Sequence, residues 1–110
     1  MDKLNILWTS GEKETFMNMV AMYSKNAKKA KWFDEINIVI WGASTRLAAE
    51  DSEVLKELQN LLEIGITIEA CKACANKIKA APILREAGIT VKYMTALTGY
   101  IKGPDHLITV

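Results

Sequence analysis

The sequence predicts an α/β protein built on a parallel sheet, and its patterning and length support this fold class. Short runs rich in Ile, Val and Leu alternate along the chain with longer segments of helical periodicity. This alternation indicates parallel pairing, because a parallel crossover needs a long connection and a helix supplies it. The 110 residues, 50% hydrophobic and 25% charged, suit one compact domain over residues 1–110 without a linker.

Five apolar runs are the candidate strands. The first two each end in a loop of small residues, Thr9-Ser10-Gly11 and Gly42-Ala43-Ser44, which is typical of a buried strand that leads into a helix. The third run leads into a segment with two cysteines. The five candidate strands span residues 4–8, 36–41, 66–68, 89–91 and 107–110.

Helical patterns fill the segments between these runs. One apolar stripe indicates a helix over residues 12–31, which Thr9 or Ser10 would cap. Another stripe indicates a helix that Asp51 or Ser52 caps and that Gly65 ends. This second helix spans residues 51–63, and the other expected helices span residues 73–80, 82–87 and 94–101.

Ligands of open parallel sheets bind beyond the carboxyl ends of the strands, where the strand order reverses. We expect the flavodoxin-like order 2-1-3-4-5 with helices on both faces, a three-layer α/β/α arrangement. The first and third strands are then neighbours, and Ser10, Ser44 and Cys71 should line one crevice between their loops. The candidate binding residues at this crevice are Thr9, Ser10, Gly11, Gly42, Ser44 and Lys72.

The segment Cys71-Lys72-Ala73-Cys74 is the strongest candidate for chemistry. It follows the third strand and leads into a helix, where free N–H groups, the helix dipole and nearby lysines would stabilise a thiolate. We therefore expect Cys71 to face the crevice as a nucleophile with a lowered pKa. Cys74, one turn later, would face the core and resolve a disulfide or persulfide formed on Cys71.

Two other interpretations of the cysteines remain open. One or both could be small buried apolar residues. A zinc site needs about four ligands, and the chain offers only Cys71, Cys74 and His106, so another subunit would have to complete it. His106 could instead give a proton to a cysteine if the fold brought the two together. We predict no metal.

Charge and composition argue against nucleic acid and membrane as binding partners. With 14 Lys+Arg against 13 Asp+Glu, no broad basic surface for nucleic acid is expected. No apolar stretch approaches the ~20 residues of a membrane-spanning helix, and the first residues do not resemble a secretory signal. The sequence thus favours a cytoplasmic protein.

Four segments, residues 38–44, 47–51, 66–75 and 88–94, resemble the DsrE/DsrF-like family of small intracellular sulfur-relay proteins. The resemblance covers almost the whole chain, and its most specific part is the cysteine loop. It implies a flavodoxin-like domain that assembles as a homotrimer or hexamer. It also implies that Cys71 carries sulfane sulfur as a persulfide, while Cys74 matches a second cysteine found in some branches. Where the family's sulfurtransferase subunits usually carry Arg-Gly, this chain has Lys77-Ile78-Lys79-Ala80.

The leading hypothesis is a sulfur carrier or sulfurtransferase-like protein whose donor and acceptor the sequence does not name. The alternatives are a thiol-disulfide redox protein that uses Cys71 and Cys74, and a non-enzymatic oligomeric module that binds a small ligand or partner. No cofactor is predicted, because helix capping explains the FMN-like position of residues 9–15. Met and aromatic residues of the first helical region suit an oligomer interface or the core: Met17, Met19, Met22, Trp32 and Phe33.

Overall fold

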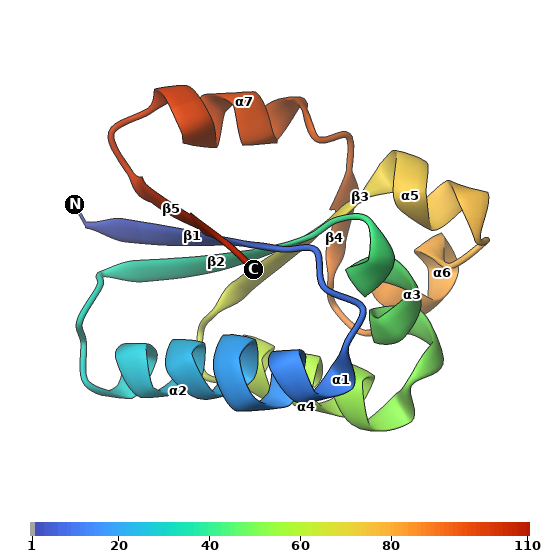
Figure 1. The fold of residues 1–110 in the computed structure, drawn as a ribbon, viewed down its shortest axis with the longest axis horizontal. Coiled ribbons are helices and arrows are strands. Elements are labelled where there is room, and N and C mark those ends of the chain that lie inside the picture. Colours follow the sequence, from blue (N-terminus) through green and yellow to red (C-terminus); the bar gives the residue numbers. More distant parts are fainter. Residues whose placement is uncertain (1) are drawn as a thin grey trace.

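The computed structural model describes residues 2–110 and contains a five-stranded, all-parallel sheet flanked by helices (Figure 1). The parallel α/β fold class is therefore confirmed. The strands lie in the order β4-β3-β2-β1-β5. They are β1 (Lys3–Trp8), β2 (Glu35–Ile40), β3 (Thr67–Cys71), β4 (Thr90–Lys92) and β5 (His106–Thr109).

The expected strand order 2-1-3-4-5 is wrong. β1 pairs with β2 and β5, so β2 separates β1 from β3. The chain extends the sheet in one direction from β1 to β4, and only the crossover before β5 returns to the free edge of β1. The apolar pattern of a parallel strand specifies its burial but not its neighbours, which is why the sequence favoured the wrong order.

The helices divide unequally between the two faces of the sheet. The first helical region and α4 cover one face, whereas α7 crosses the other; α3, α5 and α6 gather near the carboxyl ends of the strands (Figure 1). The middle of the first helical region is a π-helix, η1. The bounds are α1 (Lys13–Thr15), η1 (Phe16–Ala21), α2 (Met22–Lys29), α3 (Ala43–Glu50), α4 (Ser52–Glu63), α5 (Lys72–Lys77), α6 (Ala81–Glu86) and α7 (Thr95–Lys102).

The main core lies between the sheet and the helices of the more fully covered face. The side chains of Ile36, Ile38 and Ile40 alternate along β2 onto this face and are completely buried. Trp8 at the end of β1 stacks on Phe16 of η1, with 4.5 Å between the ring centroids. The stripe expected over residues 12–31 thus packs on the sheet as one helical region.

A second, smaller apolar cluster holds α7 against the opposite face. Leu97 of α7 packs on Leu7 and Val39, which point to this side of β1 and β2. Met94, Tyr100 and Leu107 complete the cluster. The cluster thus places α7 over β1 and β2, while Thr67 of β3 and Thr90 of β4 are exposed.

The helix ends confirm one predicted cap and correct another. Asp51 caps α4, because its Oδ1 accepts the N–H groups of Glu53 at 3.0 Å and Val54 at 3.1 Å. Thr9 caps no helix; its hydroxyl donates to the carbonyl of Val110 at 2.9 Å. None of the helices described over residues 2–110 is long and apolar enough to cross a bilayer.

Two apolar residues of α7 that differ in exposure allow a matched test of its packing. We expect Leu97→Ala to lower the free energy of unfolding by about 2 kcal/mol, because the truncation leaves a void in the small cluster. Ile101→Ala on the same helix should change it by less than ~0.5 kcal/mol, since Ile101 is 62% exposed. Urea unfolding of both variants measures the difference. Equal losses would mean that Leu97 does not pack in this cluster.

Candidate functional site

The third strand is longer than predicted, and this places Glu69 and Cys71 on the sheet. It continues from Thr67 to Cys71 rather than ending at Ile68. Because side chains alternate along a strand, Ile68 and Ala70 enter the main core while Glu69 and Cys71 point to the α7 side. Cys71 lies at the carboxyl end, and its pairing partner on β4 is Lys92.

The two cysteines form the turn between β3 and α5. Cys71 is the N-cap of α5, and its Sγ accepts the backbone N–H of Cys74 at 3.3 Å. Cys71 is only 4% exposed, whereas Cys74 is half-buried, and both are free thiols. Cys71 was expected to face a crevice and Cys74 the core, but Cys71 is the more buried of the two thiols.

The expected thiolate at Cys71 is also not what the structure favours. Burial raises the pKa of the Cys71 thiol, as does its hydrogen bond with the Cys74 thiol, and the N–H groups of Cys74 and Ala73 offset this only in part. Lys72 places its ammonium 4.9 Å from the centroid of the Tyr93 ring. Lys77 lies in the last turn of α5, away from the capped end. Cys71 thus rests as a thiol.

The predicted crevice with Ser10, Ser44 and Cys71 does not form. Ser44 is completely buried, and its hydroxyl donates to the Trp8 carbonyl at 2.6 Å while accepting the N–H of Trp41 at 3.1 Å. Ser44 therefore joins the ends of β1 and β2 and is structural. Gly42 is exposed at the start of α3 with a φ of 71°, a backbone conformation that favours glycine.

The strand order reverses between β1 and β5, but the Val110 backbone fills this position. The carbonyl of Val110 accepts two hydrogen bonds from Thr9, one from its backbone N–H at 2.7 Å and one from its side-chain hydroxyl. The hydroxyl of Ser10 accepts the N–H of Glu12 at 3.2 Å. Gly11 lines a cavity of about 490 Å³ beside Ala43 and α3, and neither cysteine lines this cavity. The loop of Thr9, Ser10 and Gly11 therefore shares no site with the cysteines.

A row of polar side chains that sequence analysis missed crosses the α7 side of the sheet. Asn37 on β2 donates to Asn5 Oδ1 on β1 at 3.2 Å and to Glu69 Oε1 on β3 at 3.0 Å. Glu69 in turn forms an ion pair with Lys92 on β4. Asn5 and Asn37 each interrupt an otherwise apolar run, and this interruption was the available signal.

Tyr100 ties α7 to this row by donating its hydroxyl to Glu69. Burial alone would raise the pKa of the Glu69 carboxyl, but hydrogen bonds from Lys92, Tyr100 and Asn37 outweigh it and lower the pKa overall. Burial and the Glu69 carboxylate together raise the pKa of Tyr100 to about 12. Glu69 is therefore a carboxylate and Tyr100 a neutral phenol at neutral pH.

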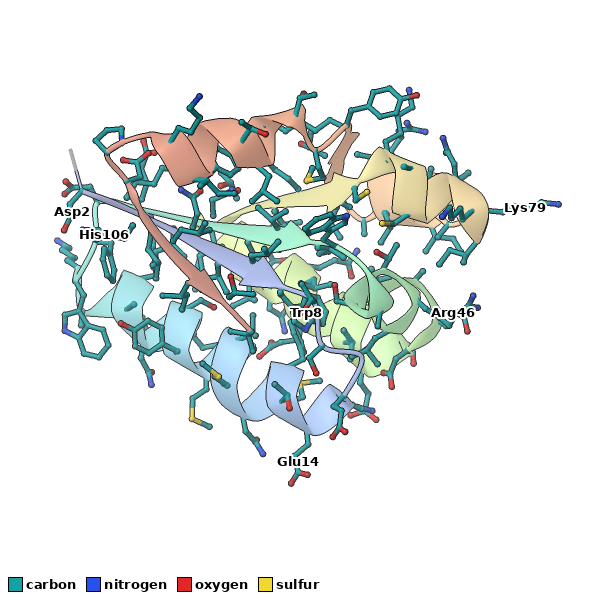
Figure 2. The ribbon with its side chains drawn as sticks, turned by 45° about the horizontal axis from the view of Figure 1, so that its top comes forward. Asp2, Trp8, Glu14, Arg46, Lys79 and His106 are labelled. Carbon is teal, nitrogen blue, oxygen red and sulfur yellow. The ribbon has the colours of Figure 1, made fainter. Side chains whose placement is uncertain are left out.

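The only histidine lies away from the cysteines. His106 begins β5, and its Nε2 is 2.9 Å from Asp2 Oδ1, so it sits at the amino end of the sheet (Figure 2). Cys71 is at the carboxyl end of β3, so His106 gives no proton to it. Across residues 2–110, no three His, Cys, Asp or Glu side chains gather as a candidate metal site.

The comparisons with known proteins identify a family without a named activity. The structure of BT1422 from Bacteroides thetaiotaomicron, a conserved protein of unknown function, is 45% identical in sequence and matches with a TM-score of 0.96. The match covers 99% of this chain and 95% of that one. The chain belongs to the same family as BT1422. No protein-family model matches the chain, and no curated protein matches it significantly.

A more distant structure shares the fold. The ychN protein from E. coli matches over 100% of both chains with a TM-score of 0.71, at 13% sequence identity. At this identity the likeness concerns the arrangement of strands and helices. The BT1422 family therefore has the same overall fold as the ychN protein.

The raised pKa of Tyr100 predicts a distinct alkaline transition. Stability that depends on the neutral phenol is present below the ordinary phenol pKa of about 10 and is lost as the pH rises through about 12. In a titration followed by phenolate absorbance, Tyr100→Phe should remove the transition near pH 12, while Tyr23→Phe should keep it. Retention of this transition in Tyr100→Phe would contradict the assignment.

Proposed function

We propose that this protein is a cytoplasmic sulfur carrier of the sulfurtransferase type that holds sulfane sulfur as a persulfide on Cys71. The observation that carries the proposal is the cysteine pair at the junction of β3 and α5, where Cys71 Sγ accepts the N–H of Cys74. Backbone N–H groups at such a turn stabilise negative charge on sulfur. The resemblance of residues 66–75 to the DsrE/DsrF-like family supports the same chemistry.

The transfer needs no external oxidant. The Cys71 sulfur forms a bond to the outer sulfur of a donor persulfide, and the S–S bond of the donor breaks. The donor leaves as a thiol and takes up the proton that Cys71 loses, so the oxidation state of the pair is conserved. The same exchange in reverse passes the sulfur to an acceptor thiol.

Burial of Cys71 suits a carrier better than a free nucleophile. A thiol with a raised pKa that is 4% exposed reacts slowly with solutes in bulk water. The donor must therefore enter the β3–α5 turn, as a small polysulfide can, and a persulfide formed there is shielded. Cys74, half-buried beside it, is placed to attack Cys71 and release the outer sulfur as hydrogen sulfide, leaving a disulfide.

The adjacent thiols also favour a second candidate, a dithiol-disulfide protein. Cys71 and Cys74 interact through a thiol hydrogen bond in addition to the backbone one. An oxidant that removes two hydrogens would join them without any sulfur gain. The two functions therefore differ in the mass of Cys74→Ser, which cannot close the disulfide and gains sulfur only if the protein is a carrier.

Intact-mass measurement after incubation with inorganic polysulfide tests the carrier. We expect the wild-type protein to gain ~32 Da, the mass of one sulfur, and to lose it on addition of dithiothreitol. Cys71→Ser should gain no sulfur. Cys74→Ser is the matched control and should load normally but hold the sulfur longer, because no neighbouring thiol resolves it.

Any other result would favour a different function. Sulfur gain that survives in Cys71→Ser and vanishes in Cys74→Ser would make Cys74 the carrier. A loss of two hydrogens in the wild type, together with no sulfur gain in Cys74→Ser, would favour the dithiol-disulfide protein. An unchanged mass in all variants would favour the non-enzymatic binding module.

We further propose that the chain forms a homotrimer or hexamer through the outer surface of η1 and α2. Met22 is 53% exposed there, and Met19 and Tyr23 are exposed beside it. Trp32, 55% exposed, packs against Tyr23 with 5.8 Å between the ring centroids. Clustered apolar side chains of this size are typical of protein contacts. Met17 and Phe33 instead pack on the core.

Light scattering tests the assembly. We expect a solution mass of three or six chains at micromolar concentration. Met22→Lys should shift the mass toward one chain, because it buries a charge in the proposed contact. Ile83→Lys changes an exposed apolar residue on α6 and serves as the control. A wild-type mass of one chain would refute the assembly.

A further inference from the structure

Positive charge is concentrated in the segment that carries the two cysteines. From the start of β3 to the end of β4, residues 67–92 hold five basic and two acidic side chains, whereas the rest of the chain holds nine basic and eleven acidic ones. The whole protein has a formal net charge of +1, but this segment alone has +3. Its basic residues are Lys72, Lys77, Lys79, Arg85 and Lys92, and its acidic residues are Glu69 and Glu86.

Most of this positive charge is not neutralised by a neighbouring carboxylate. The ammonium of Lys92 pairs with Glu69. In the part of the chain that the structure describes, the other four basic residues of the segment form no ion pair. Three of them are exposed, and Lys72 is half-buried. The segment therefore presents unpaired cations to an approaching solute.

Several of these cations lie close to the turn between β3 and α5. Lys72 directly follows Cys71, and its ammonium is 4.9 Å from the centroid of the Tyr93 ring. Tyr93 in turn follows Lys92, which pairs with Cys71 in the sheet. Lys77 ends α5, about 9 Å from Cys71 along the helix axis. At low ionic strength, charges at such distances act on a solute that reaches the cysteines.

Access to the thiols favours a small reactant. Cys71 is only 4% exposed, and Cys74 beside it is half-buried. The Cys71 sulfur also accepts the N–H of Cys74, so a reactant has to reach a thiol held inside the turn. An inorganic polysulfide is a chain of a few sulfur atoms and is an anion at neutral pH. It therefore matches both the restricted access and the positive charge of this turn.

We propose that the sulfur donor of this protein is an inorganic polysulfide anion, which the positive charge around the β3–α5 turn attracts. This inference rests on the proposed carrier function and names its substrate class. The Cys71 sulfur bonds to the terminal sulfur of the polysulfide, and the adjacent S–S bond breaks. The leaving chain is one sulfur shorter, takes up the proton of Cys71 and departs as an anion, so atoms, charge and oxidation state balance.

Two alkylating reagents of the same shape test the attraction without any sulfur transfer. Iodoacetate is an anion and iodoacetamide is neutral, so the ratio of their rates reports the charge near a thiol and cancels differences in its exposure and ionisation. At an ionic strength of ~10 mM, we expect the cysteine-side variant, Lys72→Gln with Lys77→Gln and Lys79→Gln, to lower this ratio at least ~3-fold at Cys71 and Cys74. At ~1 M salt, where charges are screened beyond ~3 Å, the difference should vanish.

The rate of sulfur loading tests the donor itself. With inorganic polysulfide at ~10 mM ionic strength, the cysteine-side variant should gain sulfur at least ~3-fold more slowly than the wild type, because fewer cations attract the anion. The rate for the wild type should fall with added salt, and the rate for the variant should depend on salt less. Intact-mass measurement at successive times gives both rates.

The matched control variant removes three lysines at the other end of the molecule. Lys29 ends α2 and Lys102 ends α7, and each helix leads into the amino end of a strand (Figure 1). Lys31 lies between α2 and β2, whereas Lys79 lies at the opposite end (Figure 2). Lys29→Gln with Lys31→Gln and Lys102→Gln should change the alkylation ratio and the loading rate by less than ~1.5-fold.

The outcomes separate this inference from the carrier function. Equal alkylation ratios in the two triple variants would overturn the inference, as would equal loading rates of the wild type and the cysteine-side variant at low salt. Sulfur loading on Cys71 in either case would leave the carrier function intact. A wild type that gains no sulfur, although the cysteine-side variant has a lowered alkylation ratio, would refute the carrier function and not the attraction of anions.

Discussion

The register of β3 is the constraint on which the rest of the structure depends. Ile38 on β2 lies opposite Ile68, and Ala70 lies opposite Val91 on β4, so both apolar residues of β3 enter the main core. The same alternation puts Glu69 and Cys71 on the α7 side. A shift of one residue would bury the Glu69 carboxylate among isoleucines and expose the core residues. One register therefore fixes the core, the polar row and the position of the cysteine.

The α7 side shows why this sheet can carry polar chemistry in its interior. Most parallel sheets are apolar on both faces because helices cover both. Here α7 packs on β1 and β2 of the second face, and the hydrogen bond from Tyr100 to Glu69 joins it to the row that crosses the strands. A buried polar group destabilises the fold unless it is hydrogen-bonded or ion-paired. Asn37 bonds with Asn5 and Glu69, and Glu69 also pairs with Lys92.

Local sequence signals predicted most elements but not their arrangement. Alternation and caps located the five strands and the helix that starts after Asp51, because these features depend on neighbouring residues. The strand order depends on which sheet edges meet, and no local pattern encodes that. The helix α3 was not predicted, since Gly42-Ala43-Ser44 looked like a binding loop. The hydrogen bond from the Ser44 hydroxyl to the Trp8 carbonyl depends on a contact with a strand that is distant in the sequence.

The cysteine site illustrates the same limit in its chemistry. The motif and its place after a strand predicted that two thiols would meet a helix end, and the cap geometry of Cys71 agrees. The sequence did not predict the burial that opposes ionisation, because β3 continues to Cys71 and carries the thiol into the sheet. Backbone N–H donors lower the pKa of the Cys71 thiol, whereas burial raises it, and burial has the larger effect here. The reactivity of Cys71 is therefore governed by whatever opens the turn to a donor, more than by the residues of the CxxC motif themselves.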